Sequence, residues 1–261
     1  MVFLTKNNCI RILFGIICLL CFSSCDKEEE TFSLNIKFKH LIDNEEIVYG
    51  NDNMVYNNNN SNIYSVRRLL YVLSDVVLYF DDGSSLLLDN FFFINTDSSE
   101  TLSHTIENIP RICSGISFRL GFSSEDNIDN AYVNYPDNFH LSMLWPNLNG
   151  TNIAYQGGYH YMKLEGKYLV DDINLDPKNS QSFFYNTHTG PLNGNDNSYS
   201  YSFNINYSQG QSQLYIDMDI NKFFNNPVYD HNYYGQGIMG SAEAQSAIKN
   251  NLADVFTVTS N

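Results

Sequence analysis

The sequence predicts an all-β protein, an antiparallel β-sandwich of about 8–10 strands with one late C-terminal helix. Several segments alternate apolar and polar residues with a period of two, which is the pattern of a strand with one buried face. The chain also contains 19 Tyr and 18 Phe together with abundant Asn. This composition favours strands and Asn-rich turns over helices.

The predicted strands follow one another along the chain. The first spans residues 32–40, where the alternation places His40 on the buried side. Further strands are predicted, in order, at residues 64–80, 86–95, 115–122, 140–145, 158–170, 183–187, 199–207 and 213–220. The polar segments 43–63 and 123–138 are predicted loops.

The one predicted helix spans residues 241–255. Ser241 can cap its first turn, and Ala247, Ile248, Leu252 and Val255 fall at helical spacing. We find no internal repeat and no composition break, so residues 32–261 are expected to form a single domain.

The N-terminus is predicted to carry a secretion signal over residues 1–24. Lys6 and Arg11 precede an apolar run at residues 12–22, which is too short to span a bilayer, and two small serines then precede Cys25. Cys25 is therefore the expected lipidation site of a bacterial lipoprotein. The alternative is an ordinary secretory signal that leaves this cysteine free.

Residues 25–31 are expected to form an acidic tether between the lipid and the folded domain. The run resembles the acidic signals that send some Gram-negative lipoproteins to the outer face of the cell, although a plain hydrophilic spacer would have the same composition. We expect attachment to a membrane through the lipid anchor. The expected location is the cell envelope, as an outer-membrane lipoprotein that faces the periplasm or the medium.

Charge and cysteine usage exclude several classes of function. The formal net charge of −15 leaves no basic face for nucleic acid. Four of the five cysteines lie in the signal or at the anchor, so Cys113 is the only one in the domain. An internal disulfide and a cysteine-based zinc or iron–sulfur site are therefore excluded by count.

The usual enzyme motifs are missing, and no catalytic activity is expected. The acidic segments 124–129 and 171–176 fit solvated turns better than calcium loops. Any copper or zinc site would have to use histidines, because thiolates are scarce. The six are His40, His104, His140, His160, His188 and His231. Taken singly, each is more typical of a structural or surface histidine, and His40 and His188 are the least ordinary.

Five segments occur in an order typical of a known family. They are RLLYVLSDVVL at 68–78 followed by Asp82-Gly83, GISFRLG at 115–121, HLSMLW at 140–145, GYHYMKLEG at 158–166 and FYNTHTG at 184–190. The chain thereby resembles the MbnP-like proteins, which are secreted or lipid-anchored β-sandwich proteins. The best-known members of that family bind copper beside methanobactin systems.

The resemblance implies a site and a partner. In the copper-binding relatives, a Trp oxidised to kynurenine and nearby His side chains hold the metal, and a di-haem peroxidase-like partner performs the oxidation. The corresponding stretch here, residues 84–97, contains neither Trp nor His. Only His188 matches a family ligand position, and His40 is the second candidate ligand. Other residues of the family segments, Trp145, Tyr159 and Glu165, are expected to be structural.

Two functions remain open at this stage. The first is a non-catalytic metal-handling lipoprotein, with copper as the expected ion. The second is a surface binding module whose end loops present Tyr, Trp and Asn to a glycan or a protein partner. A hydrolase is disfavoured, because no two carboxylates occur at a defined separation.

Overall fold

The computed structural model describes residues 31–50, 52–88, 90–110, 112–147, 157–170, 181–205 and 212–260. The predicted signal peptide 1–24, Cys25 and the acidic segment 171–176 lie outside the described residues. The chain divides into two units, Met1–Thr31 and Phe32–Asn261, and the second contains every element named below. Among the described residues, no helix has the length and apolar character needed to span a membrane.

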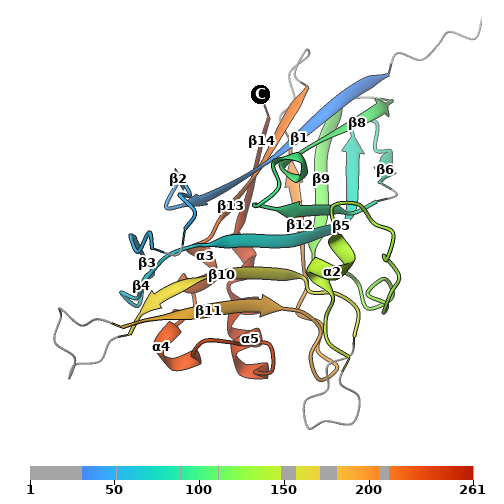
Figure 1. The fold of residues 1–261 in the computed structure, drawn as a ribbon. Coiled ribbons are helices and arrows are strands. Elements are labelled where there is room, and N and C mark those ends of the chain that lie inside the picture. The colour runs from blue at the N-terminus through green and yellow to red at the C-terminus, as the bar shows by residue number, and fades with distance from the viewer. Residues whose placement is uncertain are drawn as a thin grey trace, which may run out of the picture. The chain divides into compact units, whose positions relative to one another are not determined.

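The first sheet is centred on the N-terminal strand β1 (Phe32–Ile42). This strand lies between β13 (Gln213–Asp219) and β8 (Ser103–Ile109) (Figure 1). Strand β14 (Phe256–Ser260) adds to β13, and the short β2 (Glu45–Glu46) pairs with the end of β1. The pairing of β1 with β13 is parallel, and the other pairings in this sheet are antiparallel.

The second sheet is built around the long strand β5 (Arg68–Phe80). On one side β5 pairs with β9 (Cys113–Leu120), which pairs with β12 (Tyr199–Asn204). On the other side it pairs with β10 (Met162–Leu169), which pairs with β11 (Ser182–Thr189). The pairings are antiparallel, and four short strands complete the sheet: β3 (Tyr56–Asn57), β4 (Ile63–Tyr64), β6 (Ser85–Leu87) and β7 (Phe92–Asn95).

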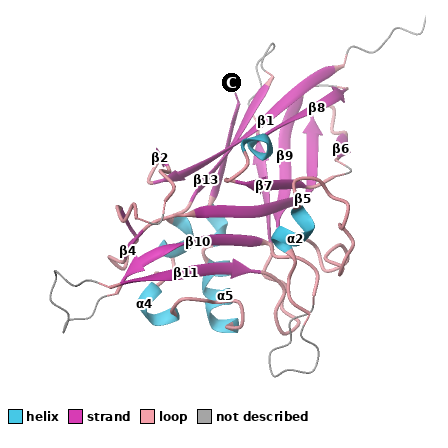
Figure 2. Cartoon of the chain, in the orientation of Figure 1, coloured by secondary structure: helices cyan, strands magenta, loops and turns pink. Residues whose placement is uncertain are grey.

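Helices are few and short beside the strands (Figure 2). Within the described ranges they are η1 (Ser99–Leu102), α2 (Phe139–Met143), α3 (Lys222–Asn225), α4 (His231–Tyr234), α5 (Ala242–Asn250) and η3 (Leu252–Asp254). Helix α5 confirms the predicted late helix, and the Ser241 side chain accepts a hydrogen bond from the Ala244 amide as expected of a cap. It ends before the predicted boundary at Val255.

The strand predicted at residues 140–145 is wrong, because α2 occupies most of this segment. Phe139 and Met143 are four residues apart, so one helical turn places both on the same buried face. Over so few residues, an apolar pattern does not distinguish one turn of helix from a short strand.

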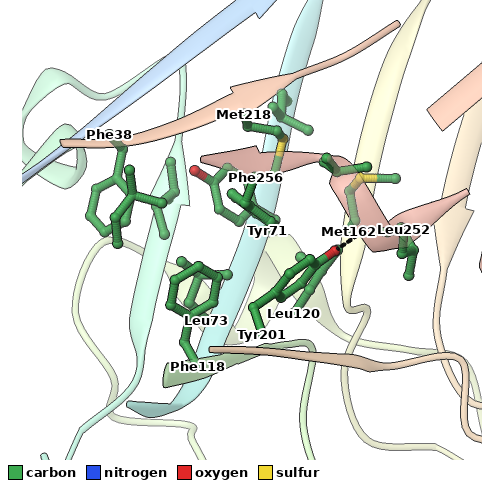
Figure 3. Packing of buried hydrophobic residues seen from close by; sticks show 14 of the residues in the cluster. Phe38, Tyr71, Leu73, Phe118, Leu120, Met162, Tyr201, Met218, Leu252 and Phe256 are labelled. Carbon is green, nitrogen blue, oxygen red and sulfur yellow. Dashed lines mark hydrogen bonds between the residues drawn. The ribbon is translucent and has the colours of Figure 1, made fainter. Parts of the chain in front are cut away.

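The main core fills the space between the two sheets. Phe256 of β14 packs against Tyr71 of β5 and Phe118 of β9, with ring centroids 6.1 and 5.3 Å apart (Figure 3). At one edge of this core, the Tyr201 hydroxyl donates a 2.7 Å hydrogen bond to the Leu252 carbonyl oxygen. Two sheets packed face to face confirm the predicted β-sandwich.

A second, smaller core lies on the outer face of the second sheet. Leu70 and Val72 alternate with core-facing Tyr71, so they point to this outer face. Helix α2 and the segments beside it cover Leu70 and Val72 with Phe139, Met143 and further buried aromatic side chains. Water is therefore excluded from part of the outer face, and this lowers the effective dielectric constant around the polar groups at the border of the second core.

Candidate functional site

A polar cluster borders the second core on the outer face of the second sheet. In the strand register, Glu165 of β10 is paired with Arg68 of β5, and Lys163 is paired with His188 of β11. Met162 and Leu164 of β10 pack in the main core. Because side chains of a strand alternate between its two faces, Lys163 and Glu165 point to the opposite face. Three strands thus bring one carboxylate, one imidazole and several cations together.

Glu165 is the centre of the cluster. Its Oε1 accepts hydrogen bonds from His188 Nε2 at 2.9 Å and Arg68 Nη2 at 3.1 Å, and its Oε2 accepts from Arg68 Nε at 2.8 Å. Arg67 also donates to Oε2. Burial alone would raise the pKa of Glu165, but the hydrogen bonds from His188 and Arg68 outweigh it and hold the pKa well below its usual range. The carboxylate is therefore ionised at neutral pH.

The partner histidine is neutral. Burial lowers the pKa of His188, and the hydrogen bond to Glu165 offsets only part of that effect. Since an ionised carboxylate only accepts hydrogen bonds, Nε2 of His188 must carry the proton. In a neutral imidazole this leaves the lone pair on Nδ1.

A second neutral imidazole packs against the first. The rings of His160 and His188 meet edge to face, with centroids 5.2 Å apart and an interplanar angle of 85°. Burial, together with the neighbouring His188, lowers the pKa of His160 to about 3. Its Nδ1 lies 3.0 Å from the Met143 carbonyl oxygen, which only accepts, so Nδ1 carries the proton. Nε2 of His160 is buried and has no hydrogen-bond partner within the described part of the chain.

The position of His160 is fixed from both sides. The predicted turn at residues 124–129 holds the segment before it, because Asp129 accepts from the Gly158 amide at 2.6 Å and Asn127 accepts from the Tyr159 amide at 2.7 Å. The Trp145 ring packs on the other side, 4.7 Å from the His160 ring between centroids. Trp145 and Tyr159, which the sequence led us to expect as structural residues, are both fully buried.

The two metal ligands suggested by the sequence do not meet. His40 lies in the main core, with Nε2 3.1 Å from the Tyr71 hydroxyl. Tyr71 is paired with core-facing Met162, whereas His188 is paired with Lys163 on the outer face. His40 and His188 therefore lie on opposite sides of the second sheet, and the structure gives His188 the neighbour His160 instead. Across the described ranges, no group of three or more His, Cys, Asp or Glu side chains is placed to share a metal ion.

Sequence reasoning passed over His160 because its place depends on strand pairing. It lies in the segment 158–166, just before β10, and the sequence shows nothing unusual about it. Only the register of β10 with β11 brings it beside His188. A signal was nevertheless present, since the segments that hold His160 and His188 are both among the five that resemble the known family.

The fold and this cluster together define a class: a two-sheet β-sandwich with a carboxylate–histidine cluster on its partly covered outer face. Residues 31–240 match the family model of MbnP, and the chain belongs to that family. Among solved structures, MbnP from Methylosinus trichosporium matches with a TM-score of 0.53 and 10% sequence identity, over 88% of this chain and 99% of that one. At this identity the likeness shows the fold alone. None of the curated proteins compared matches the chain.

Proposed function

We propose that this MbnP-family protein is a lipid-anchored protein of the cell envelope that binds copper or a similar soft metal ion through His160 and His188. The observation that carries the proposal is the contact between two neutral imidazoles. Each ring has one nitrogen engaged by an oxygen atom, Met143 O for His160 and Glu165 for His188. The other nitrogen of each ring keeps its lone pair.

This donor set fits a metal ion. Histidines that bind metals usually donate their other N–H to a carbonyl or a carboxylate, which fixes the tautomer and the ring orientation. An unpartnered buried nitrogen such as His160 Nε2 is costly unless a ligand satisfies it. Two imidazoles suit copper(I), which accepts low coordination numbers, better than structural zinc, which takes four protein ligands.

The proposal replaces the Trp and His pair of the copper-binding relatives, which this chain does not contain at the corresponding position. The corresponding stretch, residues 84–97, carries aromatic residues where that pair would stand, and Phe93 packs on Phe139 with ring centroids 5.1 Å apart. These rings belong to the second core. On this proposal, His160 supplies the imidazole that the stretch does not contain.

Copper(I) titration of the purified protein in detergent tests the proposed site, with a chromophoric chelator as competitor. We expect one equivalent to bind, and we expect His160→Gln and His188→Gln each to weaken the affinity at least about tenfold, as loss of a ligand does. His40→Gln, which alters a buried imidazole on the other side of the sheet, is the matched control and should bind as the parent does. Absence of copper binding, or unchanged affinity in both site variants, would contradict the proposal.

The anchor is tested separately. Cells fed labelled palmitate should incorporate label into the parent protein and into Cys21→Ser, whereas Cys25→Ser should remain unlabelled. Cys25 follows two serines, and Cys21 follows two leucines and is the poorer candidate. Label retained in Cys25→Ser would exclude this cysteine as the lipidation site.

A further inference from the structure

A large cavity lies where the two sheets approach each other, and it shares no lining residue with the His160–His188 site. Its volume is about 1000 Å³. Most of its lining comes from three segments: residues 104–107 of β8, residues 91–93 at the start of β7, and much of the segment 131–137. Leu88, Asn90 and Glu100 complete the lining that the structure describes. We call it the β8 groove.

The groove follows a free strand edge. Successive side chains of a strand point to opposite faces, yet the consecutive residues His104, Thr105, Ile106 and Glu107 all line the groove. The groove must therefore meet β8 along its edge. One edge of β8 pairs with β1, and no other strand pairs with β8 in the described part of the chain. Backbone donors and acceptors of β8 are thus open to an added strand.

The opposite wall is aromatic. The Tyr135 ring stacks on Phe91 with centroids 4.0 Å apart, and its hydroxyl donates to the Phe91 carbonyl oxygen. Phe92 packs on the His104 ring at 4.8 Å, which joins β7 to β8. Such a wall offers apolar contact to alternate side chains of an extended ligand.

The charged groups of the groove have one sign. Glu100, Glu107 and Asp137 line it and are exposed, and among the described residues no lysine or arginine lines it. Burial lowers the pKa of His104, so this imidazole adds no positive charge at neutral pH. A second copy of the chain would place like carboxylates opposite one another, in a protein whose net charge is already −15. A positively charged occupant is complementary.

We propose that the β8 groove binds an extended, basic peptide segment of a partner protein. The segment adds to the free edge of β8 as a further strand. Its Lys or Arg side chains lie near Glu100, Glu107 and Asp137, and its alternate apolar side chains contact the aromatic wall.

The test uses a fluorescently labelled hexapeptide of alternating Lys and Val, titrated against the full-length protein in detergent. The variant Glu100→Lys/Glu107→Lys/Asp137→Lys should weaken binding at least about tenfold, because it reverses the charge of the groove. The control Glu45→Lys/Glu46→Lys/Glu125→Lys changes the net charge equally at exposed positions outside the groove. It should leave the affinity nearly unchanged.

Backbone methylation distinguishes strand addition from general attraction to an acidic protein. A strand offers the amides of alternate residues to each edge, so methylating one set of peptide amides should abolish binding and methylating the other set should not. Bound peptide should also slow hydrogen exchange of residues 103–109. The proposal fails if the peptide does not bind, if both charge variants weaken binding alike, or if both methylated peptides bind equally. It also fails if lysine amide competes as well as the hexapeptide, since the groove would then be a site for small cations.

Discussion

The imidazole of His160 stands edge-on to the imidazole of His188, 5.2 Å away between centroids. His188 is anchored by Glu165 in the sheet, whereas His160 precedes β10 and is pressed in place by Trp145. The pair therefore depends on two independent supports. Each support can be disturbed without changing either histidine.

The support on the Trp145 side predicts a role for Gly190. A Cβ at position 190 would lie 2.7 Å from a carbon of the Trp145 ring, so Gly190→Ala should displace the ring from its present contact with His160. We expect a loss of about 1–3 kcal/mol in the free energy of unfolding, the usual range for overpacking. Because Trp145 is the sole tryptophan, its emission should also shift to longer wavelength.

Gly237→Ala is the matched control for this substitution. A Cβ there meets no atom within 4 Å. Urea unfolding and tryptophan emission should match the parent. Equal effects of the two substitutions would show that Gly190 is not the point where Trp145 is held.

The support on the sheet side predicts that Glu165→Gln is destabilising. The substitution removes the charge that faces Arg67 and Arg68 while keeping the size of the side chain. We expect a loss of about 2–4 kcal/mol at neutral pH, as when one partner of a buried ion pair is removed. Asp52→Asn, which breaks the exposed contact with Lys167, should have no measurable effect in the same urea experiment.

A third prediction concerns acid unfolding. His231 is fully buried among aromatic rings, and burial lowers its pKa to about 3 from an ordinary 6.5. Between these values the unfolded chain binds a proton that the folded chain does not, so stability is lost as the pH falls. One such histidine contributes a slope of about 1.4 kcal/mol per pH unit.

His231→Phe should therefore flatten the dependence of the unfolding free energy on pH between 6 and 4, as measured by urea unfolding at several pH values. The surrounding rings include those of Tyr168 and Tyr185, with centroids 5.5 and 4.7 Å from the imidazole. Phenylalanine fits such a setting without an unpaired nitrogen. A slope that stays as steep as the parent's would contradict the assignment.

The hydrogen bond drawn in Figure 3 gives a fourth prediction. Tyr201→Phe leaves the ring in the main core but removes the donor to Leu252 O, which is 2.7 Å away. We expect a loss of about 1–2 kcal/mol, because a buried acceptor loses its partner. Tyr233→Phe, at an exposed hydroxyl, should leave the thermal midpoint unchanged.

The sequence predicted the sandwich well because burial imposes the alternation of β1 and β13, and that alternation is visible without a structure. The same reasoning failed at α2, where one helical turn and a short strand give similar patterns. The late helix was recognised from its cap at Ser241. The parallel pairing of β1 with β13 could not be foreseen, because strand partners are a property of the whole chain.

The site was predicted only in part. His188 and His40 were singled out as candidate ligands, but His40 lies on the other side of the second sheet, and the histidine beside His188 is His160. Alternation within β1 correctly placed His40 on a buried face. Alternation does not show against which residues of the other sheet that buried face packs. That packing determines which side chains lie close enough to bind the same ligand.

The position of β1 at the centre of its sheet has a consequence for the order in which the chain folds. Its neighbours in the sheet are residues 103–109 and 213–219. Strand β1 therefore cannot form its backbone pairings until these two distant segments of the chain are available. Contacts over such long separations close slowly. If the chain crossed a membrane N-terminus first, the apolar face of β1 would stay exposed until most of the chain had crossed. A chaperone that binds unfolded chains would be needed most during that interval.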